Sequence, residues 1–469
     1  MSRGRLVVHA HFYQPERRDP FSGRVPPARS AAPYHDWNER IDAECYRPNA
    51  ERGSFARISF DIGPTLASWL AEHDPTTLAR IVADGAGAMA QAYHHAILPL
   101  ASMRDRKTEI RWGMRDFFLR FGRPAESIWL PETAMDRPTL RIAAAEGIRH
   151  TILAPWQAAD PELDTRRPYL VDAGAGRPLI VAFYDRALSG AVSFQDEATA
   201  DADRFGRDWV APRFAGPMPL GVTHPLAVIA TDGELYGHHK QFRDLFLQRL
   251  VSEAPDLPDR GFDVVPLASV VRELPRVPFP LVRVREGTSW SCLHGILRWM
   301  GECPCASDGR WKAPLRAAFE RLAGGIDAVA ETLVGTAGME PALLWAARDR
   351  YVDVASGFEA PDAFVGRILG THATPARSAL LASVLDAQRW RLAMFASDGW
   401  YWDDPAREET RHVLRCAARA ARTMDTLAGS RLEATLLDDL ALLSSPSRRV
   451  DGAALYRESL VEVGQPVRV

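Results

Sequence analysis

Over its first 275 residues the chain alternates short apolar runs with longer amphipathic segments, and this pattern strongly limits the folds open to it. Short apolar runs predict buried strands, and the segments between them are long enough to form helices. Strands that alternate with helices make parallel sheets or barrels. The sequence therefore predicts an α/β fold of the (β/α) barrel type.

The predicted elements follow from apolar spacing. The predicted strands are Leu6–Val8, Ser127–Leu130, His150–Leu153, Leu179–Phe183 and Ala227–Ala230. The predicted helices are Pro64–His73, Thr76–Ala90, Met114–Phe121 and Pro138–Glu146, the last capped by Asp136.

A second region begins after Pro275–Pro280, where three prolines in six residues exclude a helix interior. From Lys312 to about Leu436, apolar residues recur at the three- and four-residue spacing of amphipathic helices. We therefore expect a catalytic barrel over residues 1–275, a connecting segment over 276–311 and an all-helical C-terminal domain over 312–469.

Charge and cysteine content exclude several classes of protein. A formal charge of −3 over 469 residues gives no cationic field, so neither nucleic acid nor an anionic membrane is an expected partner. No stretch approaches the roughly 20 apolar residues of a membrane span. Five thinly spread cysteines are unlike a secreted disulfide framework. We expect reduced thiols and a cytoplasmic protein.

Polar residues just past the carboxyl ends of barrel strands converge on one mouth, where catalytic groups are expected. Glu132 follows the apolar run of SIWLPETA, and His9, His11 and Gln14 follow the first strand. Glu132 lies six residues before Pro138, which is too far for a helix dipole to account for it. Structural histidines remain an alternative for the first strand.

The segment ATDGELYGHH places Asp232, Glu234, His238 and His239 after another apolar run. Burying ionisable side chains costs free energy unless they are paired with other groups or take part in the function of the site. Gly233 permits unusual backbone angles, so that both acids can face one cavity. A metal site is the alternative, because all three residue types are ligands.

Other strand ends and loops supply candidate sugar contacts. Asp185 follows a strand, although it has the alternative of pairing with its neighbour Arg186. Aromatic and imidazole groups suit a sugar, which offers both CH faces and hydroxyls. Core packing is the alternative for each tryptophan. The candidates are Tyr93, His94, His95, Trp112, Trp129 and Trp156.

In order and spacing, HAHFYQP, YHHAILPL, SIWLPETA and ATDGELYGHH resemble the conserved regions of glycoside hydrolase family 57 over roughly residues 5–300. The resemblance implies a (β/α)7-type incomplete barrel with a following helical domain, a carbohydrate substrate of the α-glucan type, retention of configuration and no cofactor or metal. It also implies that Glu132 is the nucleophile and Asp232 the acid/base. The later stretches resemble a bacterial subset with a helical domain of unknown function.

Retaining chemistry implies two carboxyl groups about 5–5.5 Å apart. Asp232 then needs a pKa raised by burial and by the charge of Glu132. Glu234 is expected to support the site by holding a histidine or a sugar hydroxyl.

The segment Ser289–Cys305 allows two interpretations. Cys292, His294, Cys303 and Cys305 are soft metal ligands, but they lack paired C-x2-C spacing, and no bound metal is predicted. Alternatively, Trp290, His294 and Trp299 close a substrate cleft.

Two other functions remain open. The same barrel and histidines fit a metal-dependent deacetylase or mannosidase-like hydrolase, and a barrel without chemistry fits a glycan-binding protein. The surfaces of the helical half also leave room for a homo-oligomer.

Overall fold

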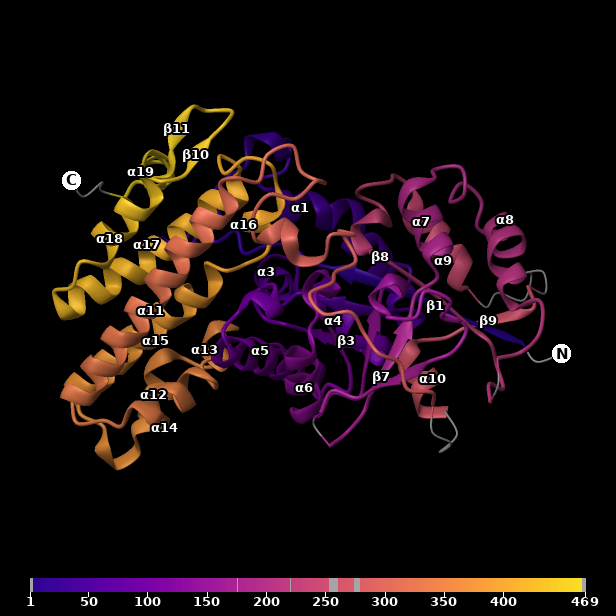
Figure 1. Ribbon diagram of the computed structural model, residues 1–469, viewed down its shortest axis with the longest axis horizontal. Helices are drawn as coiled ribbons and strands as arrows, with labels where there is room; N and C mark the ends of the chain where they lie inside the picture. Colours follow the sequence, from indigo (N-terminus) through magenta and orange to yellow (C-terminus); the bar gives the residue numbers. More distant parts are fainter. Residues whose placement is uncertain (1–2, 175, 220, 253–259, 274–278, 466–469) are drawn as a thin grey trace. The chain divides into compact units, whose positions relative to one another are not determined.

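The computed structural model describes residues 3–465 apart from 175, 220, 253–259 and 274–278 (Figure 1). The chain forms two compact units. The barrel unit comprises Met1–Gln14, Pro27–Ala92 and Phe117–Trp290, and the helical unit comprises Pro15–Pro26, Tyr93–Asp116 and Ser291–Val469. The expected boundary at residue 275, and most of the proline-rich segment Pro275–Pro280, lie outside the described residues.

A parallel sheet forms the centre of the barrel unit. Its strands run in the order β4-β3-β2-β1-β8, and β9 pairs with the start of β1. Because all the pairs are parallel, the carboxyl ends of these strands lie at one edge. The strands are β1 (Gly4–Phe12), β2 (Ser59–Ile62), β3 (Ala88–Gln91), β4 (Ile128–Trp129), β8 (Leu226–Asp232) and β9 (Phe262–Val264).

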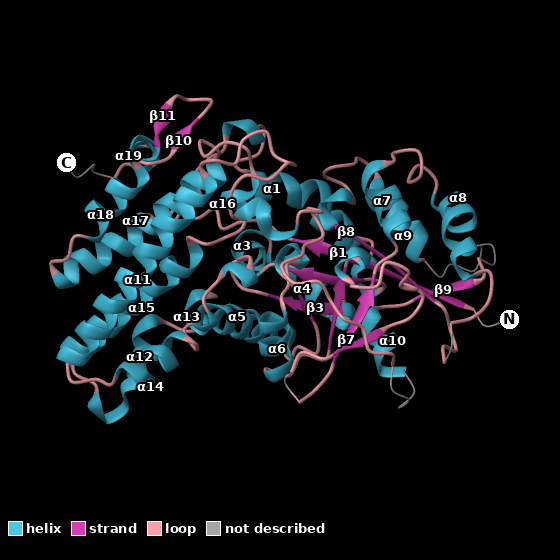
Figure 2. Ribbon diagram, viewed as in Figure 1, coloured by secondary structure: helices cyan, strands magenta, loops and turns pink. Residues whose placement is uncertain are grey.

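A second group of strands continues the barrel wall. Strand β5 (His150–Leu153) is parallel to β7 (Leu179–Phe183), which pairs antiparallel with β6 (Tyr169–Val171). A parallel bridge joins Ser127, next to β4, to His150 of β5. The expected α/β fold, an incomplete barrel followed by a helical region, is confirmed (Figure 2).

Helices between the strands complete the barrel unit. Asp136 caps α6 by accepting from the Thr139 backbone N–H, as predicted. The helices are α1 (Trp37–Ile41), α2 (Arg47–Glu51), α3 (Pro64–His73), α4 (Pro75–Ala83), α5 (Met103–Phe121, shared with the helical unit), α6 (Arg137–Ala145), α7 (Arg186–Phe194), α8 (Ala202–Phe205), α9 (Arg243–Val251) and α10 (Leu267–Glu273).

Several predicted bounds were wrong. The predicted helix Thr76–Ala90 ends at Ala83, and its last residues enter strand β3, because partners in the sheet override the helix propensity of alanine. Strand β1 continues to Phe12, so His9 and His11 lie within the strand and not beyond it.

One hydrophobic cluster of the barrel unit lies on one face of its strands. Val7 of β1 packs with Val228 and Ala230 of β8 and with Trp129. Successive side chains of a strand alternate between faces, so residues 7, 9 and 11 of β1 point the same way. The apolar core at Val7 therefore gives way to polar groups toward the carboxyl edge.

The helical unit is built around long amphipathic helices, as expected. Its centre holds buried arginines whose charges are paired: Asp105 accepts from Arg348 at 3.0 Å and from Arg391 at 2.6 Å. The remaining elements are α11 (Lys312–Thr336), α12 (Pro341–Arg348), α13 (Val352–Ala355), α14 (Pro361–Leu369), α15 (Pro375–Ala393), α16 (Asp398–Tyr401), α17 (Glu408–Ala428), α18 (Leu432–Leu440), β10 (Ser444–Ser445), β11 (Val450–Asp451) and α19 (Gly452–Val461).

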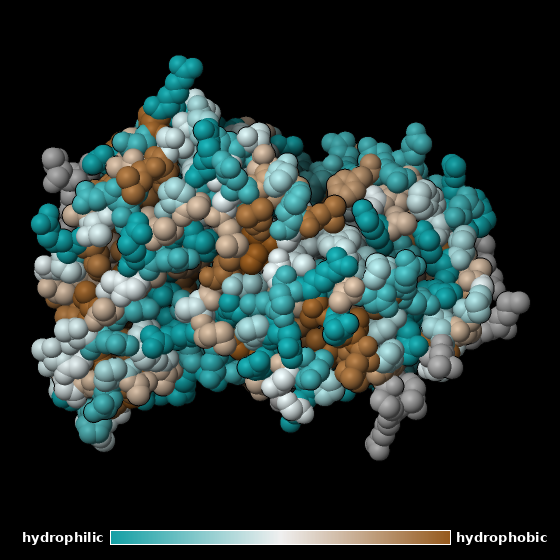
Figure 3. All heavy atoms as spheres, in the orientation of Figure 1, coloured by the Kyte–Doolittle hydropathy of each residue, from teal (hydrophilic) through white to brown (hydrophobic). Residues whose placement is uncertain are grey.

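The viewed surface mixes hydrophilic side chains with smaller groups of apolar ones (Figure 3). Within the described part of the chain, no helix is both long and apolar enough to cross a membrane.

Candidate active site

Glu132 lies in a strained turn directly after β4. The short 3-10 turn Pro131–Thr133 gives Glu132 a φ of 57° and Thr133 a φ of 46°. Positive φ values are uncommon for residues other than glycine and cost free energy. The surrounding structure must therefore hold this turn in place, which is a frequent property of functional sites.

Gln157 is one of the residues that hold the turn. Its side-chain amide donates to the Thr133 carbonyl at 2.9 Å and its oxygen accepts from the Thr133 hydroxyl at 2.9 Å. The same oxygen accepts from the backbone N–H of Ala154 at 2.9 Å. Gln157 is fully buried and was not singled out from the sequence, in which only the adjacent Trp156 was noted.

Trp290 holds Glu132 itself. The indole N–H of Trp290 donates to Oε2 of Glu132 at 3.1 Å, and the backbone N–H of Trp290 donates to the Glu132 carbonyl at 3.0 Å. These bonds join two predicted site residues that are far apart in the sequence: Glu132, which follows a strand, and Trp290, which lies in a distant loop. The carboxylate of Glu132 therefore has a defined orientation.

His9 and His11 both bond to Asp61 on the neighbouring strand. His9 Nε2 lies 3.1 Å from Asp61 Oδ1, and His11 Nδ1 lies 2.8 Å from Asp61 Oδ2. The register aligns His11 with Asp61 of β2 on one side and with Asp232 of β8 on the other. Asp61 was missed in the sequence, where it does not follow an apolar run as Glu132 does, because it lies within β2.

The electrostatics of the two histidines differ. Burial lowers the pKa of His9, and the nearby Asp61 only partly offsets this effect. Burial also acts to lower the pKa of His11, but the negative charges of Asp61, Asp232 and Glu234 outweigh it and raise this pKa to about 9. His11 is therefore a cation near neutral pH.

Asp232 and Glu234 lie in different environments. Asp232 ends β8 with an exposed side chain, so the burial expected for it is wrong. Glu234 is 4% exposed and accepts from the Tyr46 hydroxyl at 2.6 Å and from the Tyr13 backbone N–H at 3.2 Å. Burial raises the pKa of Glu234 to about 7. The sequence did not predict the hydrogen bond between Glu234 and a tyrosine hydroxyl.

Gly233 allows close packing and does not supply an unusual backbone angle. Its φ is not positive, unlike that of many glycines in the chain. A Cβ at this position would lie 2.3 Å from the ring of Phe12. The residue between the two acids is therefore glycine because β1 and the turn after β8 approach closely.

Aromatic rings pack against both His9 and His11. Trp129 stacks on His9 with ring centroids 4.4 Å apart, and Trp290 meets His11 edge-on at 6.0 Å. Trp129 is fully buried, so the core-packing alternative fits it. Trp156 is partly buried and donates to the Ser289 carbonyl at 2.9 Å.

Other candidates of the barrel unit have structural partners. Asp185 caps α7 and lies 3.2 Å from Arg213, so the structure pairs it with Arg213 and not with Arg186, the alternative left open by the sequence. The Arg186 guanidinium instead lies over the Trp156 ring. His238 bonds Glu44. The Gln14 carbonyl accepts from the Thr65 hydroxyl at 2.6 Å.

Several candidates belong to the helical unit. His94 bonds Glu109 through its ring at 2.8 Å, and Tyr93 packs edge-on against the buried Trp112. Trp299 is fully buried, which fits core packing, whereas His294 is exposed and lies among cysteines.

The described residues offer few places for a metal ion. Among these residues, Cys292, His294, Cys303 and Cys305 form a cluster whose side chains lie close enough to share one ion. In the barrel unit, His9 and His11 use the nitrogens facing Asp61 to bond that carboxylate.

Comparisons with known proteins agree with this fold. Residues 84–276 match the profile of glycosyl hydrolase family 57, and residues 308–464 match a domain of unknown function, DUF3536. No curated protein sequence matches the chain significantly.

Solved structures share the fold at low sequence identity. An exo-type maltose-forming amylase from Pyrococcus sp. ST04 is 17% identical, with a TM-score of 0.75 over 97% of this chain and 88% of that chain. A family 57 branching enzyme from Pyrococcus horikoshii is 14% identical, with a TM-score of 0.58 over 93% and 88%. A 4-alpha-glucanotransferase from Thermococcus litoralis is 14% identical, with a TM-score of 0.57 over 90% and 60%.

The expected resemblance is confirmed by the profile match, which contains Glu132 and Asp232 within its bounds. Residues 84–276 thus form a glycosyl hydrolase family 57 region, which is followed in this chain by a domain of unknown function.

Proposed function

We propose that the protein hydrolyses or transfers α-glucan chains with retention of configuration, using Glu132 as nucleophile and Asp232 as acid/base. The observation that carries the proposal is the strained turn at Glu132, whose carboxylate is oriented by the indole N–H of Trp290. Strain kept at a polar residue on the carboxyl edge of a barrel favours catalysis over packing.

The reaction proceeds in two displacements. A carboxylate oxygen of Glu132 attacks the anomeric carbon, the glycosidic C–O bond breaks, and Asp232 gives its proton to the leaving oxygen. Asp232 then takes a proton from water or from a sugar hydroxyl, whose oxygen displaces Glu132 and regenerates the carboxylate. This chemistry requires the two carboxyl groups to lie about 5–5.5 Å apart.

Neighbouring groups set the charge around Asp232. His11, a cation below about pH 9, is aligned with Asp232 across the sheet. Glu234, two residues further on, holds its proton until about pH 7. A buried neutral acid and a cation beside Asp232 limit the negative charge that accumulates when it releases its proton.

Other expectations remain predictions. The predicted sugar contacts are His9, His11, Gln14, Trp129, Trp156, Asp185, Glu234, His238 and Trp290 in the barrel unit, and Tyr93, His94, His294 and Trp299 in the helical unit. The boundaries 1–275, 276–311 and 312–469, the cytoplasmic and bacterial setting and a homo-oligomer are likewise predictions.

The test is turnover of maltooligosaccharides and of branched α-glucans by Glu132→Gln and its matched control, Glu126→Gln. Glu126 is a surface residue whose side chain lies 3.6 Å from Arg149. We expect Glu132→Gln to lose at least about a thousandfold in kcat and the control to keep full activity. NMR of the first product should show the α-anomer. Full activity of Glu132→Gln, or an inverted product, would contradict the proposal.

A further inference from the structure

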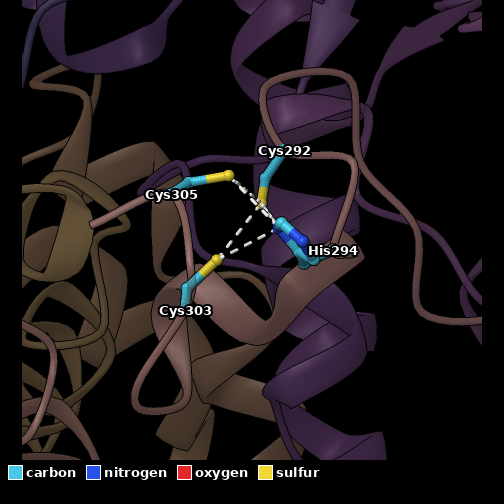
Figure 4. Close-up of side chains that lie close together, drawn as sticks. All are labelled: Cys292, His294, Cys303 and Cys305. Atoms are coloured by element: carbon cyan, nitrogen blue, oxygen red, sulfur yellow. Dashed lines mark hydrogen bonds between the residues drawn. The ribbon is translucent and has the colours of Figure 1, made fainter.

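Three cysteine sulfurs and one histidine nitrogen gather in the helical unit (Figure 4). The four ligand atoms of Cys292, His294, Cys303 and Cys305 all lie within 4.8 Å of one another. The Cys292 sulfur lies 3.5 Å from that of Cys303, well beyond the roughly 2.05 Å of a disulfide bond. The cluster is therefore made of separate thiols that point at a common centre.

The distances fit a tetrahedron of zinc ligands. Zn–S bonds of about 2.3 Å and Zn–N bonds of about 2.0–2.1 Å separate sulfurs by about 3.8 Å and a sulfur from a nitrogen by about 3.6 Å. The Cys292 sulfur lies 3.5 and 3.7 Å from those of Cys303 and Cys305. His294 Nδ1 lies 3.7, 3.6 and 3.2 Å from the sulfurs of Cys292, Cys303 and Cys305. These five distances lie within about 0.4 Å of the tetrahedral values, and the Cys303 and Cys305 sulfurs, which lie within 4.8 Å of each other, need to approach by at most about 1 Å to hold the ion.

Two tight turns present these ligands. The Gly295 N–H donates to the Cys292 carbonyl at 3.0 Å, and the Ala306 N–H donates to the Cys303 carbonyl at 2.9 Å. Each turn carries its ligands two residues apart, as Cys-x-His and Cys-x-Cys. The spacing therefore differs from paired C-x2-C motifs, which explains why sequence spacing argued against a metal.

The surroundings of the cluster carry a compensating positive charge. Lys312 is fully buried, its ammonium donates to the Arg298 carbonyl at 2.9 Å, and its charge interacts with Cys303 and Cys292 of the cluster. Three thiolates and one Zn²⁺ leave a net charge of about −1. A buried cation near such a site offsets that charge, because opposite charges attract strongly in a poorly solvated environment.

We propose that Cys292, His294, Cys303 and Cys305 bind one structural zinc ion. Four protein ligands fill a tetrahedral shell and leave no position for water or substrate, which distinguishes a structural site from a catalytic one. The ion joins two turns that are 11 residues apart in the chain, from Cys292 to Cys303. Its binding free energy adds to the stability of the folded helical unit.

The test measures zinc in the untagged full-length protein, after purification and after chelation and reloading with ZnSO₄. We expect about one zinc per chain in both preparations. We also expect a lower Tm after chelation, and thiolate-to-metal charge-transfer absorption when cobalt(II) replaces zinc. Cys305→Ser changes an exposed ligand at little packing cost and should lose at least about 90% of the bound zinc.

Cys416→Ala is the matched control. Cys416 lies 3.4 Å from His412 in the same unit but outside the cluster, so its loss should leave the zinc content unchanged. Equal zinc content in the wild type and in folded Cys305→Ser would overturn the proposal. So would a metal-free wild-type protein that takes up no cobalt, or one in which mass spectrometry finds a native disulfide between Cys292 and Cys303.

Discussion

Replacing Asp61 by asparagine removes the charge shared by two buried histidines. Asp61 is fully buried and lies 3.1 Å from His9 and 2.8 Å from His11. Together with Asp232 and Glu234, it outweighs the effect of burial and raises the pKa of His11 from 6.5 to about 9. A difference of 2.5 pKa units corresponds to about 3 kcal/mol.

The sign of the effect follows from linkage. The folded protein binds the His11 proton more tightly than the unfolded chain, so this stabilisation is fully present below about pH 6.5. It is lost as the pH rises through about 9. In Asp61→Asn the largest attraction is gone, and we expect the free energy of unfolding at pH 6 to fall by about 2–3 kcal/mol. The deficit should shrink toward pH 9.5.

Urea unfolding at several pH values, together with NMR titration of the histidine rings, measures both quantities. Asp263→Asn is the control, since Asp263 pairs with Arg3 at 2.8 Å on the surface and an exposed pair contributes little. If Asp61→Asn has the same pH dependence of unfolding and the same His11 pKa as the wild type, the argument is wrong.

Three further predictions concern the same edge of the barrel. Gly233→Ala should lower the free energy of unfolding by about 1–3 kcal/mol, measured by urea unfolding, because the new Cβ would lie 2.3 Å from the Phe12 ring; an unchanged midpoint contradicts this. Trp290→Phe keeps a ring but removes the indole N–H that holds Glu132, so kcat should fall about tenfold while Tm changes little; unchanged kcat would show that this bond does not orient the nucleophile. The pKa of Glu234 is raised to about 7, so its contribution to stability is greatest below about pH 4.5 and is lost as the pH rises through 7. Glu234→Gln should therefore flatten the pH dependence of the free energy of unfolding between these values. An identical slope in the wild type and the variant refutes the assignment.

The sequence predicts those features of the fold and the site that depend on neighbouring residues in the chain. Strands β5 and β7 end where predicted, because their apolar residues fit a buried sheet and polar residues or turns follow them. Glu132 and Asp232 stand out because each carboxylate directly follows such a run. Whether a residue lies at the end of a strand depends on its neighbours in the chain, so it can be recognised from one sequence alone.

Relations between strands are not visible in the same way. Asp61 becomes important only because the β1–β2 register places it beside His11, and that register depends on the folded sheet. The different environments of Asp232 and Glu234 likewise arise from the turn after β8, which brings the Glu234 side chain to the Tyr46 hydroxyl. Composition and spacing identify the acids but not which one is buried.

The charges of the site connect stability to catalysis. Below about pH 7 Glu234 is neutral, and the positive charge of His11 balances the negative charge of Asp61. Between about pH 7 and pH 9 Glu234 gains a negative charge while His11 stays positive, so the environment of Asp232 becomes less able to accept further negative charge. The groups that set the pH dependence of unfolding therefore also act on the proposed acid/base. A variant that changes one of these charges should therefore move the pH profile of kcat together with that of stability.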